Sequence, residues 1–144
     1  MNKLQGKHIF IVEDNAQNRV VYQIMFLRQG AVIDFDRWGS DTIHKLKNLP
    51  EVDVIIMDLM LAGGVTGFGI MEQIQQQEKL SRVPVVAVSA VDPATAILRC
   101  QDAGFAGFIA KPIDADRFPD LIARIIAGER VWLTNSLNYE TTAL

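Results

Sequence analysis

The segments IFIVEDNAQN (residues 9–18) and VIIMDLM (residues 54–60) share the pattern that decides the fold. Each begins as a run of apolar, mostly β-branched residues, which is typical of a buried strand. Each run then ends on carboxylates: Glu13 and Asp14 in the first segment, and Asp58 in the second. Because a buried acid without a partner is costly, these positions need a structural or functional reason.

Apolar runs of the same kind recur along the chain and alternate with segments of helical spacing. Strands are predicted at residues 8–12, 31–35, 54–57, 85–89 and 107–110. Helices are predicted at residues 16–29, 40–49, 67–78, 93–103 and 114–127. In the first helix Val20, Ile24 and Leu27 share one face. This alternation predicts an α/β fold, a flavodoxin-like doubly wound parallel sheet of five strands in the order 2-1-3-4-5 with five helices.

Composition indicates an ordinary globular protein: 49% of the 144 residues are hydrophobic and 22% are charged. We expect one domain at residues 1–128, and a C-terminal tail at residues 129–144 that could pack on the domain, mediate dimerisation or be disordered. No apolar run is long enough to cross a bilayer, no secretory signal is visible, and the net charge of −3 forms no block. The expectation is therefore a cytoplasmic protein that binds neither nucleic acid nor membrane.

Cys100, the only cysteine, is expected to pack in a helix.

The acids at the strand ends predict a metal site. The carboxyl ends of neighbouring parallel strands meet at one edge of the sheet, so Glu13, Asp14 and Asp58 should converge there. Carboxylates about 4 Å apart repel one another by roughly 4 kcal/mol per pair. A divalent cation relieves that repulsion, and Mg²⁺ prefers such oxygen ligands. The alternative is that these acids are solvated strand ends or helix caps.

A hydroxyl and an ammonium are expected at the same edge. Ser89 ends the fourth predicted strand, and Lys111 follows the fifth. Together they could hold a phosphoryl group beside the metal and neutralise its charge. Singly, each also has a structural explanation, as a strand-end hydroxyl and as a surface lysine.

Taken together, these residues resemble the receiver domain of the two-component response regulator family, chemotaxis-type, over residues 7 to about 127. VEDN (12–15) resembles the family's acidic pair, IIMDLM (55–60) its phosphoacceptor strand, VVAVSA (85–90) its switch-hydroxyl strand and GFIAKPI (107–113) its lysine–proline turn. Each fragment alone is a weak signal, but their joint spacing is highly specific.

The resemblance implies roles for individual residues. Asp58 would be the phosphoacceptor, Asp14 a direct Mg²⁺ ligand, Glu13 a ligand acting through water, and the Met60 backbone carbonyl a third protein ligand. Ser89 and Lys111 would contact the phosphoryl oxygens, and the Lys111–Pro112 bond would be cis. Phe108 would be a switch aromatic that turns inward on phosphorylation; the alternative is a core aromatic of the fifth strand.

The same resemblance implies partners. A histidine kinase or phosphotransfer protein would supply the phosphoryl group, and the changed surface would bind a downstream protein target or form a homodimer through the fourth helix, fifth strand and fifth helix. The domain would catalyse its own phosphorylation and dephosphorylation, as a signalling phosphoacceptor rather than an enzyme acting on other substrates. The length fits a free-standing receiver, and a fragment of a larger regulator is the alternative.

One segment departs from the family pattern. After Asp58 the chain reads LMLAGGVTGFG (59–69), with Ala62 where the family usually has proline and a loop through Gly63 and Gly64 that is one residue longer. This departure bears on the choice of kinase and on the kinetics of phosphorylation.

Two other functions stay open: a receiver-like module that acts without phosphorylation, and an enzyme or cofactor binder on the same fold. Against the latter, EDNAQN (13–18) is acidic where a nucleotide-phosphate loop would stand, and Met60 occupies the second-acid position of an aspartyl phosphatase.

Overall fold

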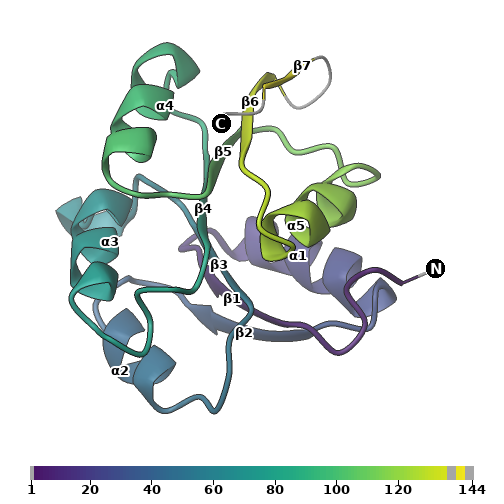
Figure 1. Ribbon diagram of the computed structural model, residues 1–144, viewed down its shortest axis with the longest axis horizontal. Helices are drawn as coiled ribbons and strands as arrows, with labels where there is room; N and C mark the ends of the chain where they lie inside the picture. Colours follow the sequence, from purple (N-terminus) through teal and green to yellow (C-terminus); the bar gives the residue numbers. More distant parts are fainter. Residues whose placement is uncertain (1, 136–138, 142–144) are drawn as a thin grey trace.

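The computed structural model describes residues 2–135 and 139–141 and has a sheet with helices on both faces (Figure 1). The five expected strands are present and pair in parallel: β1 (His8–Val12), β2 (Val32–Asp36), β3 (Val54–Met57), β4 (Val85–Ser89) and β5 (Gly107–Ala110). Their order in the sheet, β2-β1-β3-β4-β5, confirms the predicted order. The carboxyl ends of β1 and β3 are therefore neighbours.

In the described residues five α-helices connect the strands: α1 (Ala16–Arg28), α2 (Thr42–Lys47), α3 (Gly67–Gln75), α4 (Pro93–Asp102) and α5 (Phe118–Ile126). A short 3₁₀ helix, η1 (Ala62–Gly64), lies between β3 and α3. In Figure 1, α1 and α5 cover one face of the sheet, while α2, α3 and α4 cover the other. Each face encloses its own apolar core, and Cys100 of α4 lies in the core beneath α3 and α4. Burial, partly offset by the charge of Arg99, raises the pKa of Cys100 to about 12, so this thiol packs rather than reacts.

The sheet is larger than predicted because the segment set apart as a tail adds to it. Strand β6 (Val131–Asn135) pairs in parallel with β5, and β7 (Tyr139–Thr141) pairs antiparallel with β6, which gives seven strands within the described residues. Val131, Trp132 and Leu133 are buried. Of the three roles left open for residues 129–144, packing on the domain is therefore the one observed for β6. Residues 136–138 and 142–144 lie outside the described part.

The face of α1 that packs on the sheet is not the one marked by its aliphatic residues. Val20, Ile24 and Leu27 do share a face, but they are 53%, 51% and 57% exposed. The buried residues are Tyr22, Met25 and Phe26. The ring of Phe118 in α5 packs against both of these aromatic residues: its centroid is 5.9 Å from the Tyr22 centroid and 5.9 Å from the Phe26 centroid. Aromatic rings bury more area than Val or Leu, so they occupy the core, and the aliphatic face of α1 is left in solvent.

The last helix begins later than expected. The carboxylate of Asp114, the first residue of the predicted range, accepts a hydrogen bond from the Asp116 N–H at 3.0 Å and closes a turn before the helix, which begins at Phe118. Pro119 then lies in the first turn of α5, where a missing N–H is tolerated. None of the helices in the described ranges has the length and apolar character that crossing a membrane requires.

Candidate functional site

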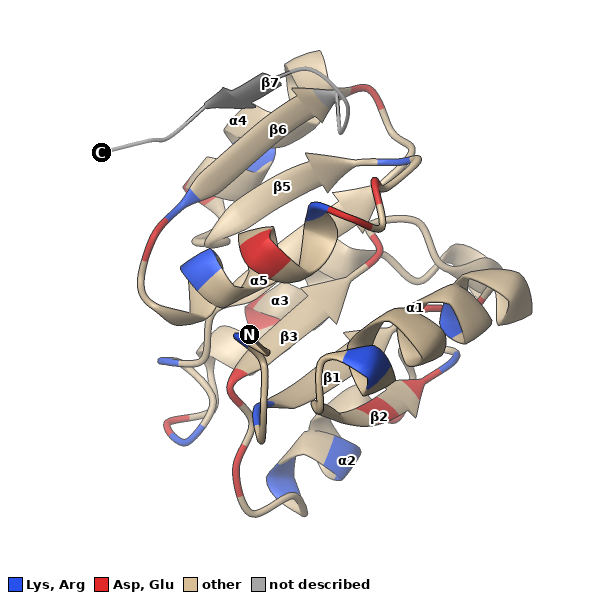
Figure 2. Cartoon of the chain, turned by 90° about the vertical axis from the view of Figure 1, so that its right-hand side faces the viewer, with Lys and Arg blue, Asp and Glu red and all other residues tan. Residues whose placement is uncertain are grey.

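The acids that end β1 and β3 converge, as predicted. One carboxylate oxygen from each of Glu13, Asp14 and Asp58 lies within 4.8 Å of the others. The register explains this, because Val12 at the end of β1 pairs with Met57 at the end of β3. Elsewhere the charges are dispersed: Figure 2 shows basic and acidic positions interspersed over the face that α1 and α5 cover.

Asp58 is held by three donors. Its Oδ1 accepts hydrogen bonds from the Ser89 hydroxyl and the Met60 backbone N–H, both at 3.1 Å. Its Oδ2 accepts one from the Lys111 ammonium at 3.0 Å. Asp58 is only 9% exposed and Ser89 only 1%. The carboxylate is therefore fixed in position by side chains that arrive from the ends of β4 and β5.

Lys111 joins two of the acids. Its Nζ lies 2.9 Å from Glu13 Oε1 as well as 3.0 Å from Asp58 Oδ2. Burial by itself lowers the pKa of Lys111, but the hydrogen bond to Glu13 and the charge of Asp58 outweigh it, so the pKa is raised. The amine stays protonated and partly neutralises the acidic cluster. The Lys111–Pro112 peptide bond is cis, which confirms the expectation.

Glu13 and Asp14 are not the caps of α1. That role belongs to Asn15, whose side chain accepts a hydrogen bond from the Asn18 N–H at 3.0 Å. Glu13 is 1% exposed and accepts from the Asn15 backbone at 3.2 Å and the Asn18 side chain at 3.3 Å. Asp14 accepts from the Ala62 N–H at 2.7 Å. The helix-cap alternative for these acids is therefore wrong.

Three carboxylates at this spacing are a donor set that suits Mg²⁺, which takes oxygen ligands and retains several waters. Asp14 is partly exposed, which leaves the cluster open to solvent on one side. The Met60 backbone lies at the same place, since its N–H contacts Asp58. The residues present fit a magnesium ion.

The loop after Asp58 needs its glycines. Gly63 and Gly64 have φ angles of 74° and 78°, in the left-handed region that favours glycine. Sequence reasoning anticipated a loop here but missed Gly67, the first residue of α3. A Cβ on Gly67 would lie 2.6 Å from the Asp58 carbonyl oxygen and 2.9 Å from the Met57 side chain. Only glycine lets α3 start this close to the end of β3, and no pattern in the sequence marks that contact.

Replacing Gly67 by alanine is expected to destabilise the protein by about 1–3 kcal/mol, because the backbone at Asp58 must shift to admit the methyl group. Denaturant unfolding measures this loss. Gly69→Ala is the matched control in the same helix, since its Cβ would meet nothing closer than the Thr66 hydroxyl at 3.5 Å. That control should be neutral or slightly stabilising. Equal losses for the two variants would contradict the argument.

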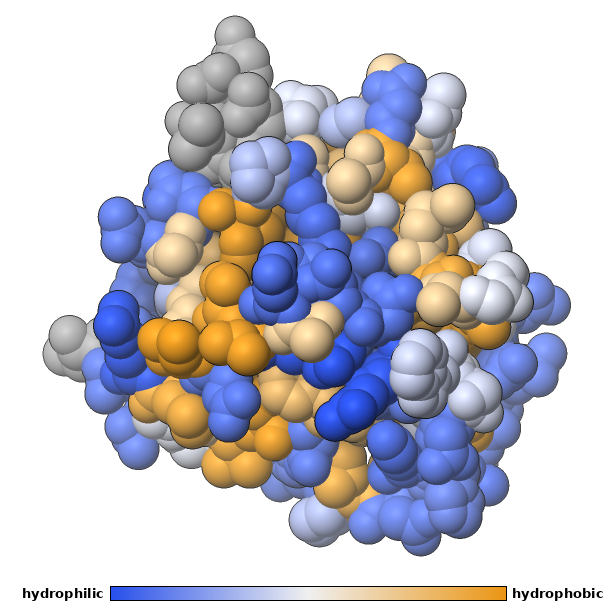
Figure 3. All heavy atoms as spheres, turned by 180° about the vertical axis from the view of Figure 1, so that it is seen from behind, coloured by the Kyte–Doolittle hydropathy of each residue, from blue (hydrophilic) through white to orange (hydrophobic). Residues whose placement is uncertain are grey.

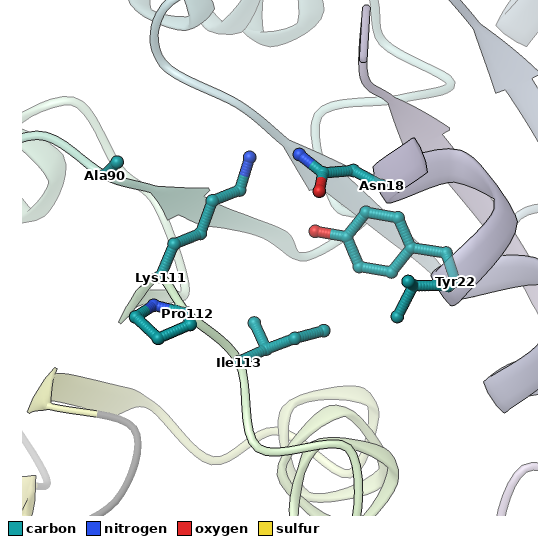
Figure 4. Close-up of a pocket in the computed structure, with 7 residues that line it drawn as sticks. Asn18, Tyr22, Ala90, Lys111, Pro112 and Ile113 are labelled. Atoms are coloured by element: carbon teal, nitrogen blue, oxygen red, sulfur yellow. The ribbon is translucent and has the colours of Figure 1, made fainter. Parts of the chain in front are cut away.

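Two further residues border the site without having been predicted. Tyr22 and Asn18 of α1 lie beside Lys111 in a pocket (Figure 4). By contrast, Phe108 is part of the core: its ring is fully buried, and Trp132 of β6 is its register partner. The structure thus brings together the side chains of Glu13, Asp14, Asp58, Ser89 and Lys111 and the Met60 backbone. Phe108 is not part of this group and lies in the apolar core.

Comparisons with known proteins agree with this geometry. The profile of the response regulator receiver domain family matches residues 9–123. A two-component response regulator of Oryza sativa subsp. japonica is 28% identical over 120 residues, which cover 83% of this chain and 88% of that protein. The hybrid signal transduction histidine kinase L of Dictyostelium discoideum is 30% identical over 128 residues, covering 85% of this chain and 7% of that protein.

Two solved structures are also similar. The receiver domain of a sensor histidine kinase from Pseudomonas aeruginosa PAO1, which has a magnesium ion coordinated in its active-site cleft, aligns with a TM-score of 0.76 at 27% identity, covering 85% of this chain and 99% of that one. The chemotaxis response regulator CheY4 of Vibrio cholerae aligns with a TM-score of 0.76 at 17% identity, covering 84% and 99%. The second likeness concerns the fold alone.

Proposed function

The chain belongs to the response regulator receiver family, and from that premise we propose that Asp58 accepts a phosphoryl group from the phosphohistidine of a histidine kinase or phosphotransfer protein. The observation that carries this proposal is that Ser89, Met60 and Lys111 hold the Asp58 carboxylate in place. Asp58 is buried and lies within the cluster that it forms with Glu13 and Asp14. A carboxylate held in one orientation is prepared for in-line attack on phosphorus.

The chain's own residues have separate tasks in this transfer. An Asp58 oxygen forms the new bond to phosphorus while the bond from phosphorus to the histidine nitrogen breaks, and its electron pair returns to the ring. Lys111 and Ser89, which contact the two Asp58 oxygens, are then positioned to donate to the phosphoryl oxygens. Mg²⁺, held by Asp14, Asp58, the Met60 carbonyl and, through water, Glu13, would neutralise the charge of the transferred group. Hydrolysis of the acyl phosphate would reset the domain, so that it catalyses its own phosphorylation and dephosphorylation.

The output step is proposed to begin at Ser89 and to pass through Phe108. Drawing the Ser89 hydroxyl toward a phosphoryl oxygen would disturb β4, and Ala87 of that strand is the register partner of Phe108. The Phe108 ring is already buried beside Trp132, so the movement would reach β6 rather than turn an exposed ring inward. A downstream protein or a second copy binding at α4, β5 and α5 would therefore also meet β6 at the edge of β5.

The donor is proposed to dock on the aliphatic face of α1, made of Val20, Val21, Ile24 and Leu27. These residues are between 45% and 57% exposed, which is unusual for four large apolar side chains on one helix. They belong to the helix layer that lies on the left in Figure 3, where apolar side chains gather. The face reaches the site through Val21, which lines a pocket together with Lys111, the partner of Glu13 and Asp58. A cytoplasmic location, which a kinase partner would require, remains a prediction.

Phosphoryl uptake from acetyl phosphate tests the proposal. The native chain should gain one phosphoryl group by intact mass when Mg²⁺ is present and none without it. Asp58→Asn should gain none, because the amide oxygen is a poor nucleophile and carries no charge for the metal. Circular dichroism of the variant checks that it is folded. Failure of the folded native chain to gain mass with Mg²⁺ present would favour the alternative, a receiver-like interaction module that acts without phosphorylation.

A further inference from the structure

A pocket of about 420 Å³ opens between α1 and the turn that follows β5, directly beside the acidic cluster. Its walls are mostly apolar and come from Val21, Ala90, Pro112 and Ile113. Three polar side chains complete it: Asn18, Tyr22 and Lys111. Figure 4 shows the Lys111 ammonium and the Tyr22 hydroxyl turned toward the same space. This volume is larger than a phosphoryl group requires, and the apolar walls provide no hydrogen-bond donors for its oxygens.

The Tyr22 hydroxyl makes this pocket more than a packing gap. Tyr22 is only 2% exposed, and its hydroxyl has no hydrogen-bond partner among the described residues, although it points into the pocket. The hydroxyl is open to the pocket, so its hydrogen-bonding capacity is available to a molecule bound there. Burial, with the charges of Glu13 and Asp58, raises the pKa of Tyr22, so the group is a neutral phenol that can donate or accept.

The pocket is connected to the reacting group through Lys111. That ammonium lines the pocket and also lies 3.0 Å from Asp58 Oδ2. A molecule in the pocket would thus lie next to a phosphoryl group bound to Asp58, on the side of α1. It would meet apolar walls on its faces, and the Tyr22 oxygen and Asn18 side chain at its edge. A small flat heterocycle with a ring N–H fits this chemistry, whereas an anion would face the charge of Glu13.

We propose that the pocket receives the imidazole ring of the donor's phosphohistidine, protonated on the nitrogen that carries no phosphorus, with the Tyr22 oxygen accepting a hydrogen bond from that N–H. This inference rests on the proposed function and deepens it, by naming residues that recognise the donor's leaving group. As the Asp58–phosphorus bond forms, the phosphorus–nitrogen bond breaks and its electron pair stays on that nitrogen. The other nitrogen keeps its proton, held on Tyr22, and the donor leaves as a neutral histidine.

The test compares two small donors that differ in their leaving group. The full chain with Mg²⁺ is mixed with phosphoimidazole or with acetyl phosphate, and the initial rate of uptake is followed by intact mass. Tyr22→Phe keeps the ring contacts to Phe26 and Phe118 but removes the hydroxyl. We expect about a tenfold lower rate with phosphoimidazole, the worth of one hydrogen bond, and less than about a twofold change with acetyl phosphate.

A second variant tests the space rather than the hydroxyl. Val21→Phe should fill the pocket and slow uptake from phosphoimidazole more than from acetyl phosphate. Gln23→Phe adds the same bulk to an exposed position of α1 that does not line the pocket, and should change neither rate. The inference would be overturned if Tyr22→Phe and Val21→Phe changed the uptake rates from both donors equally, or changed neither rate. The proposed function would still stand in that case, as long as the native chain takes up a phosphoryl group from acetyl phosphate. A native chain that takes up neither donor would overturn both.

Discussion

Replacing Lys111 by methionine is expected to destabilise the protein by about 3–5 kcal/mol in buffer free of divalent cations. The Lys111 ammonium is the shared partner of Glu13 and Asp58, which are 1% and 9% exposed. Methionine preserves the length and the apolar stem of the side chain but leaves both carboxylates without their cation. Their mutual repulsion then acts in a buried setting, where it is poorly screened. Denaturant unfolding measures the loss.

Mg²⁺ should restore part of that stability, because the metal neutralises the same carboxylates. The Lys111→Met variant is therefore expected to gain more stability from added Mg²⁺ than the native chain gains. Its phosphoryl uptake should nevertheless fall by about 100-fold or more, since a preorganised positive charge at the transferred group is lost. The two effects separate the structural role of Lys111 from its proposed role in transfer.

Lys45→Met is the control for a lysine that pairs with a buried acid elsewhere. Its Nζ lies 3.6 Å from Asp36, which is also held by the Thr42 hydroxyl. The Lys45 side chain is 42% exposed, so the expected loss is about 1 kcal/mol and does not depend on Mg²⁺. A similar Mg²⁺ response in the two variants would contradict a specific role of Lys111 at the acidic cluster.

The acidic site could be predicted because strand periodicity fixes where strands end. Once the runs before Glu13 and Asp58 are recognised as parallel strands, the edge of the sheet brings their terminal acids together. The same logic placed Ser89 and Lys111, whose contacts to Asp58 are now 3.1 and 3.0 Å. These positions depend on order along the chain and on a repeating geometry, which a sequence displays directly.

Other features depend on packing between distant segments, which a single sequence does not display. The first helix was recognised from its spacing, but the choice between its aliphatic face and its aromatic face depended on Phe118 in α5, roughly a hundred residues later. That choice turns Tyr22 toward the pocket that Lys111 also lines. Gly67 is similar, because its role lies in a contact with the Asp58 backbone rather than in its own helix.

Strand β6 escaped prediction because it follows a short turn after α5 and offers only a brief apolar run. Its partner strand carries the complementary signal: a Cβ on Gly107 of β5 would lie 2.5 Å from the Val131 carbonyl oxygen. Glycine at that position allows the backbones of β5 and β6 to approach. With β6 in place, β5 is an interior strand, and Phe108 is enclosed on the side where it would otherwise be at the edge of the sheet.

Replacing Trp132 by alanine is accordingly expected to destabilise the protein by about 3–5 kcal/mol, the cost of removing a large buried aromatic side chain. Trp132 is 2% exposed and belongs to the same core as Phe108 and Cys100. A loss of that size, measured by denaturant unfolding, would establish that residues beyond the family match at 9–123 contribute to the stability of the domain.

Two further substitutions separate burial from the chemistry of the indole. Trp132 Nε1 is buried without a hydrogen-bond partner among the described residues, so Trp132→Phe removes an unpaired donor along with some volume and should lose less than about 1.5 kcal/mol. Trp38→Ala, at a tryptophan that is 56% exposed, should change stability by no more than about 0.5 kcal/mol. If Trp132→Ala were as mild as Trp38→Ala, β6 would not be part of the cooperative fold. Phe108 would then be free to respond to phosphorylation at the edge of the sheet, without transmitting the change to β6.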